Sequence, residues 1–141
     1  MENEKNFILV CLRTIKENIM IGRKPNYNPV SISGASKQER FELLWRVFNK
    51  VFNKLHTSRY VSCKDINIDE EFNFNKDLVI IENIELLVGN SQLQDKICNI
   101  INECLENNIQ IILCSNENIE DLVIEEHIKC RLRWGISLYL K

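Results

Sequence analysis

The chain has 141 residues, 45% apolar and 27% charged, which suits a single globular domain over residues 1–141. Acidic and basic residues are interspersed and leave a net charge of −2, which does not favour autonomous DNA binding. No apolar run approaches the roughly 18 residues of a membrane span. The acidic start, MENEKNFILVCL, lacks the pattern of a signal peptide. We therefore expect a cytoplasmic protein that does not contact membranes.

The first half of the chain predicts a short strand followed by a long helix. Residues 6–21 fit a strand or a helix, although the part from Arg13 onward favours a helix. Prolines and a glycine then interrupt the chain, and PVSIS at 29–33 predicts a strand. Apolar residues at spacings of three and four predict a helix over 37–55. That predicted apolar stripe comprises Phe41, Leu44, Trp45, Phe48, Val51, Phe52 and Leu55.

The second half predicts strands that alternate with helices. The predicted strands are 59–62, 78–81, 110–115 and 136–140, and the predicted helices are 91–106, capped by Ser91, and a shorter one within 119–131. Residues 64–76 favour a connecting loop. This order predicts a parallel sheet covered by helices on both faces. Ligands of such sheets bind where the strands end, here at 33–34, 82–83 and 115–116.

The cysteines and histidines carry no clear site pattern. None of the six cysteines forms a C-x-x-C pair or a zinc-like spacing with His56 or His127. We expect the cysteines to be small buried apolar side chains. The histidines have no partner evident by spacing and are expected on the surface. The sequence thus assigns no catalytic residue and no metal ligand.

Four segments, spread from residue 27 to residue 136, resemble one protein family. They are YNPVSISG at 27–34, DLVIIENIELLVG at 77–89, QIILCSN at 110–116 and EEHIKCRLRWGI at 125–136. In order and spacing they are similar to the AAA+ domain of the bacterial DnaA family and its shorter relative Hda. The resemblance implies a three-layer, P-loop NTPase-like α/β fold and a role in initiating chromosome replication.

The phosphate-binding loop departs from the pattern G-x-x-x-x-G-K-[ST]. Aligned on Gly34 the chain reads GASKQERF, so Glu39 replaces the second glycine and Arg40 replaces the lysine. Phe41 replaces the hydroxyl that would hold Mg²⁺. Lys37 could supply part of the lost charge. The other interpretation is that the loop binds nothing and Phe41 packs in the core.

The other nucleotide positions are partly retained. The resemblance places Glu82 and Asn83 where the family has two acidic residues, and Asn83 cannot act as a carboxylate base. Asn116 takes the sensor 1 position, where an amide can still orient water or phosphate. The adenine-cupping loop, the DNA-handling helices, the helical lid and the helix-turn-helix domain are not found between Asn6 and Lys141.

Arg131 aligns with the arginine finger, which in this family reaches the ATP of a neighbouring protomer. Here it could act in trans on a partner with an intact site. The simpler interpretation is an exposed arginine beside Lys129 and Arg133 at a helix end.

Three functions compete on this reading. The first is a non-catalytic, Hda-like regulator that contacts DnaA or other replication proteins and needs no cofactor, with self-association left open. The second is a weak ATPase or nucleotide switch that binds ATP or ADP with Mg²⁺ through Lys37 or Arg40, Glu82 and Asn116. The third is a DNA-binding initiator fragment, which the acidic balance disfavours.

Overall fold

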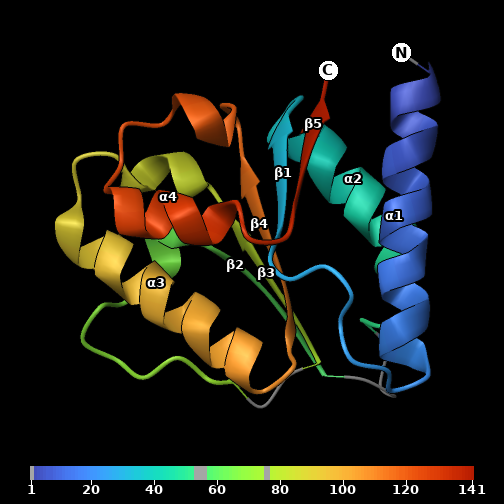
Figure 1. Cartoon of the computed structure of the whole chain (residues 1–141), viewed down its shortest axis with the longest axis horizontal. Coiled ribbons are helices and arrows are strands. Elements are labelled where there is room, and N and C mark those ends of the chain that lie inside the picture. The colour runs from blue at the N-terminus through green and yellow to red at the C-terminus, as the bar shows by residue number, and fades with distance from the viewer. Residues whose placement is uncertain (1, 53–56, 75–76) are drawn as a thin grey trace.

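The computed structural model describes residues 2–52, 57–74 and 77–141, and its centre is a five-stranded parallel sheet (Figure 1). The strand order is β2-β3-β4-β1-β5, and every neighbouring pair is parallel. This confirms the predicted α/β class. The strands are β1 (Val30–Gly34), β2 (Ser58–Ser62), β3 (Leu78–Glu82), β4 (Gln110–Ser115) and β5 (Ile136–Leu140).

Helices cover both faces of the sheet, so the fold has three layers (Figure 1). Alternate strand residues face opposite layers: Ile80 and Ile112 pack with α1 and α2, whereas Ile81 and Leu113 pack with α3 and α4. The three central strands are buried along their whole length, as expected for a parallel sheet between helices. The helices are α1 (Glu2–Met20), α2 (Lys37–Phe48), α3 (Ser91–Glu106) and α4 (Glu126–Leu132).

The N-terminal segment is one long helix. The strand that residues 6–21 also allowed is wrong, because Ile8, Leu12 and Ile15 recur at helical spacing and are buried against the sheet. Helix α3 begins as predicted, but its cap is Asn90 rather than Ser91, since the Asn90 side chain accepts from the Leu93 N–H at 3.0 Å.

Helix α2 is shorter and narrower in its buried face than the sequence predicted. It ends at Phe48 instead of residue 55, and Leu55 lies outside the described residues. Leu44 and Phe48 are buried. Phe41 and Trp45 lie at the side of this buried face and are about half exposed. Phe41 therefore does not pack in the core. Its ring contacts Tyr60 edge-on, and the Trp45 ring stacks on Phe52.

Five of the six cysteines are buried, in agreement with their predicted apolar role, but Cys130 is exposed on α4. Burial raises the pKa of the Cys63 and Cys104 thiols to about 12. His127 is on the surface as expected, and His56 lies outside the described residues. None of the helices in the described part of the chain combines the length and hydropathy needed to cross a bilayer.

The sheet register brings the candidate residues to one edge. Ser33 pairs with Ser115 and Ser62 pairs with Glu82, so strands β1, β4, β3 and β2 end side by side. Three-residue and four-residue 3-10 turns follow several of these ends, at Cys63–Asp65, Ile84–Leu87 and Ile119–Asp121. The carboxyl edge of the sheet is therefore the place where a ligand of this fold would bind.

Candidate functional site

The turn between β1 and α2 stands where a phosphate-binding loop would be. Gly34 has a φ of 87°, and a Cβ there would lie 2.2 Å from the Leu140 carbonyl oxygen, so only glycine fits. Ala35 also has a positive φ, of 52°. The Ser36 hydroxyl then caps α2 by accepting from the Glu39 N–H at 3.1 Å.

Because α2 begins at Lys37, only two residues separate the strand from the helix. In a P-loop the whole G-x-x-x-x-G stretch lies between strand and helix, and its backbone N–H groups face the phosphates. Here Lys37 to Glu39 already belong to the helix, and the Arg40 N–H donates to the Ser36 carbonyl at 3.0 Å. The Glu39 N–H is taken by the Ser36 hydroxyl, so two of the backbone N–H groups that would face a phosphate are already hydrogen-bonded within the turn.

Arg40, in the lysine position, points inward and has no exposed surface. Its Nη1 donates to the carbonyls of Gly34 at 2.8 Å and Ala35 at 3.1 Å. Its Nη2 donates to Glu82 Oε1 at 2.5 Å and to Asn116 Oδ1 at 2.7 Å. Its Nε is 3.4 Å from Glu82 Oε2. A guanidinium has five N–H donors, and each of them is directed at an acceptor.

Glu82, at the end of β3, is the buried counter-ion of Arg40. Its Oε1 also accepts from the backbone N–H of Asn83 at 3.2 Å. Burial, together with the nearby Glu82 charge, raises the pKa of the Tyr60 hydroxyl and of the Cys114 thiol, so both neighbours stay protonated. The carboxylate that the family uses toward Mg²⁺ is thus engaged by an arginine of its own chain.

Asn83 and Asn116 have structural partners of their own. Asn83 has left-handed backbone, and its Oδ1 accepts from the Ser62 hydroxyl at 2.7 Å. The Asn116 N–H donates to Glu85 Oε1 at 3.0 Å, which positions the Asn116 side chain beside Arg40. Both amides therefore serve to hold strand ends together.

The structure brings together four of the seven residues that the sequence singled out: Gly34, Arg40, Glu82 and Asn116. Asn83 joins this group only through its backbone. Lys37 is exposed on the first turn of α2, and none of the hydrogen bonds or ion pairs of the described residues joins it to Arg40 or Glu82. We call Arg40, Glu82 and Asn116 the arginine plug.

Arg131 lies on the other face of the sheet, in α4, and is held against its own chain. Its Nε donates to Asn102 Oδ1 at 2.9 Å, and its Nη1 donates to the His127 carbonyl at 2.8 Å. Its guanidinium carbon is 5.3 Å from the centre of the Trp134 ring. The expectation of a freely exposed arginine is therefore wrong, because Arg131 is half-buried between α3 and Trp134.

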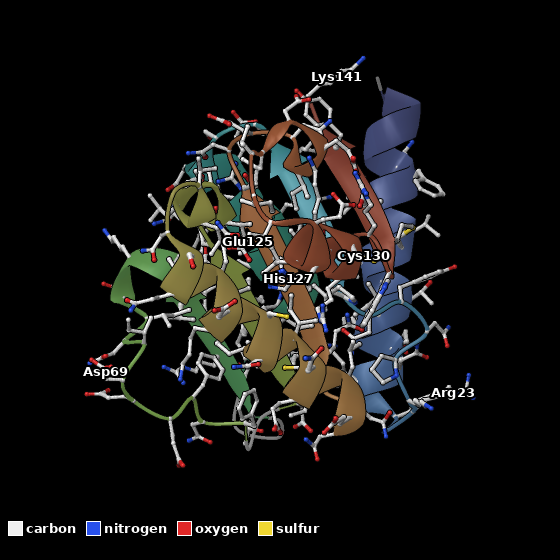
Figure 2. All side chains as sticks on the ribbon, turned by 60° about the vertical axis from the view of Figure 1, so that its left-hand side comes forward. Arg23, Asp69, Glu125, His127, Cys130 and Lys141 are labelled. Carbon is white, nitrogen blue, oxygen red and sulfur yellow. The ribbon has the colours of Figure 1, made fainter. Side chains whose placement is uncertain are left out.

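Sequence reasoning missed a second group of side chains. Asp95 of α3 lies beside Glu125 and His127 at the start of α4, where Figure 2 shows Glu125 and His127 close together. The local signal was the spacing of two between Glu125 and His127. Asp95 is remote in sequence, and only the packing of α3 on α4 brings it there.

The sheet order, the glycine turn after β1 and the acidic end of β3 together define a P-loop NTPase-like domain of the AAA+ class. The family model described as Bacterial DnaA ATPase domain matches residues 55–139, more than half of the chain. The chain therefore belongs to this family. The matched span begins after the turn that holds Gly34 and Arg40.

The chain matches part of two longer relatives. This chain is 28% identical over 127 residues to the chromosomal replication initiator protein DnaA of Chlorobaculum tepidum, covering 79% of this chain and 26% of that protein. It is 25% identical over 151 residues to DnaA of Helicobacter acinonychis, covering 94% and 34%. The chain thus spans about a quarter to a third of these relatives.

Solved structures agree on the fold. Domain III of Thermotoga maritima DnaA has a TM-score of 0.79 at 19% identity and covers 96% of this chain and 62% of that one. AMPPCP-bound DnaA from Aquifex aeolicus has a TM-score of 0.72 at 21% identity and covers 91% and 44%. The three-layer AAA+ fold inferred from the sequence is therefore confirmed.

Proposed function

We propose that this protein is a non-catalytic, DnaA- or Hda-like component of the bacterial cytoplasm that regulates or assists initiation of chromosomal replication through protein contacts. It would use the AAA+ shape without ATP, ADP or Mg²⁺. The observation that carries the proposal is the arginine plug, in which Arg40 donates hydrogen bonds to the side chains of both Glu82 and Asn116.

A nucleotide would have to displace Arg40 before its phosphates could enter. Moving Arg40 out would leave the buried Glu82 carboxylate without a counter-ion, and breaking one side of such a pair costs about 3–5 kcal/mol. That cost corresponds to a loss of affinity of about 100-fold to 5,000-fold. The Gly34 and Ala35 carbonyls would then face the phosphates in place of N–H donors.

Nucleotide titration tests the first half of the proposal. Fluorescent ATP and ADP are titrated with Mg²⁺ into the protein, with an intact DnaA as the positive control. We expect no saturable binding up to millimolar nucleotide. Binding at micromolar concentration would contradict the plug and would favour the alternative, a weak ATP- or ADP-binding switch in which Arg40 turns onto the phosphates.

The contact with a partner is proposed for the α4 side. Family membership supports a replication protein as the partner, and DnaA itself is the first candidate. An exposed aromatic ring lies against Arg131: Trp134 is 54% exposed, and its ring centre is 5.3 Å from the Arg131 guanidinium carbon. A partner with an intact ATP site would draw the Arg131 guanidinium away from Asn102.

A pull-down with DnaA of the same bacterium tests this contact. We expect the wild type to bind and Arg131→Ala to bind more weakly. Arg133→Ala is the matched control, because Arg133 lies two residues away and pairs on the surface with Glu120 and Glu126. If neither the wild type nor either variant binds DnaA, DnaA is not the partner, whatever the nucleotide titration shows.

A further inference from the structure

Three side chains of types that can bind a metal ion lie close together where α3 meets the start of α4. Asp95 comes from the second turn of α3. Glu125 directly precedes α4, and His127 lies in its first turn (Figure 2). His127 Nε2 is 3.5 Å from Asp95 Oδ1, and His127 Nδ1 is 3.2 Å from Glu125 Oε2. One donor atom from each residue lies within 4.8 Å of the others.

A buried amide fixes the backbone that carries these donors. Gln94, which directly precedes Asp95, is 4% exposed. Its Oε1 accepts from the Glu125 N–H at 2.9 Å, and its Nε2 donates to the Leu87 carbonyl at 2.8 Å. The positions of Asp95 and Glu125 relative to one another are therefore set by a buried hydrogen-bond bridge, and only short side-chain movements are needed to enclose an ion.

The local charge favours a cation. Among the described residues, His127 is the ion-pair partner of both Asp95 and Glu125. The neighbouring bases of α4 are directed elsewhere: Lys129 donates to the carbonyls of Glu120 and Leu122, and Arg131 is held by Asn102. The two carboxylates therefore face the imidazole, and neither Lys129 nor Arg131 is directed at them.

We propose that Asp95, Glu125 and His127 bind a divalent transition-metal ion of the zinc type. One imidazole and two carboxylates are a donor set that Zn²⁺ accepts, with water completing the coordination. Donors of a tetrahedral zinc lie about 3.4 Å apart, as bonds of 2.0–2.2 Å require. The 3.5 Å between His127 Nε2 and Asp95 Oδ1 is close to that spacing. Glu125 faces the other ring nitrogen, Nδ1, at 3.2 Å, so its exposed side chain has to rotate to reach an ion on Nε2.

The bound ion would join α3 to the first turn of α4. It would therefore stabilise the helix that carries Arg131 without touching the arginine plug, so the site does not depend on the proposed function. Protons compete with metal for imidazole and carboxylate, so binding weakens as the pH falls from about 7.5 to about 5.5.

Zinc titration, followed by calorimetry or by competition with a chromogenic chelator, tests the site. All variants carry Cys130→Ser, because the exposed Cys130 thiol is a competing zinc ligand on the same helix. We expect one Zn²⁺ per chain, a rise in the melting temperature with Zn²⁺, and affinity at least about tenfold weaker in His127→Gln and in Asp95→Asn.

Two control variants separate this site from other binding. His56→Gln removes the other histidine, and Glu126→Gln removes a neighbouring carboxylate that pairs with Arg133. Both should bind zinc as the parent does. Equal zinc affinity in His127→Gln and the parent, or no binding at sub-millimolar zinc, would overturn the proposal and leave the cluster as an ion pair alone.

Discussion

Arg40 and Glu82 form an ion pair in which neither side chain has exposed surface, with Arg40 Nη2 and Glu82 Oε1 2.5 Å apart. The two residues are 42 positions apart and lie at the start of α2 and the end of β3. In the family these positions serve the nucleotide, one through a cation for phosphate and the other through a carboxylate for the metal. Here the two side chains are hydrogen-bonded to one another and buried.

Arg40→Ala should lower the free energy of unfolding by about 3–5 kcal/mol, because Glu82 would remain as an uncompensated buried charge. Chemical denaturation measures this directly. Replacing both partners with apolar residues, Arg40→Met with Glu82→Leu, should recover most of the loss. Arg46→Ala is the matched control, since Arg46 is exposed on the same helix and should change stability by less than about 0.5 kcal/mol. A loss of under about 1 kcal/mol in Arg40→Ala would contradict the buried pair.

Gly34→Ala should be more damaging than the same change at Gly22 or Gly89. All three glycines have positive φ, so each substitution carries a backbone cost of about 1–2 kcal/mol. Only at Gly34 does the new Cβ also meet the Leu140 carbonyl oxygen, which would force β1 and β5 apart. Thermal unfolding of the three variants gives the comparison. Equal melting temperatures in the three variants would show that the backbone at Gly34 or Leu140 moves aside at little cost.

A single thiol should react quickly in the folded protein. Cys130 is exposed and the other five cysteines are buried, so dithiobis(nitrobenzoate) should label one thiol rapidly and six after denaturation. In Cys130→Ser the rapid phase should vanish. Rapid labelling of a second thiol would indicate that part of the core opens on the time scale of the reaction.

Stability should fall as the pH rises above about 9. Burial raises the pKa of the Cys63 and Cys104 thiols to about 12, whereas unfolded thiols titrate near 8.5–9. Between these values the unfolded chain binds fewer protons than the folded chain, so the free energy of unfolding decreases with pH. Urea denaturation at about pH 8 and pH 10 measures the slope, and Cys104→Ala should make it shallower. An unchanged slope in that variant would exclude Cys104 as a cause.

Asn102→Ala should release Arg131 at small cost to the fold. One hydrogen bond to a charged group is lost at a half-buried position, so we expect the free energy of unfolding to decrease by about 1 kcal/mol. If Arg131 contacts a partner, this variant should bind DnaA at least as well as the wild type, in contrast to Arg131→Ala. Binding reduced equally in both variants would assign Asn102 and Arg131 a purely structural role.

The sequence by itself determined the class of fold. The apolar runs at 78–81 and 110–115 are long enough, and uniform enough, to require helices on both sides of a parallel sheet. Four motif-bearing segments in order predicted the family. The sequence GASKQERF predicted a phosphate loop without the residues that hold phosphate and Mg²⁺. Continuous apolar runs and the chemistry of single residues are local properties, so they can be read from neighbours in the chain.

Only the tertiary structure decided where the charged side chains go. The sequence showed that Arg40 replaced a lysine, but its five acceptors come from three separate strand ends and could not be predicted from spacing. The same holds for Arg131 on Asn102 and for Asp95 beside His127, because both contacts depend on how α3 packs on α4. Phe41 was placed wrongly in the core for a related reason. Helical periodicity gives the width of an apolar stripe only roughly, and the sheet beneath α2 decides which part of it is buried.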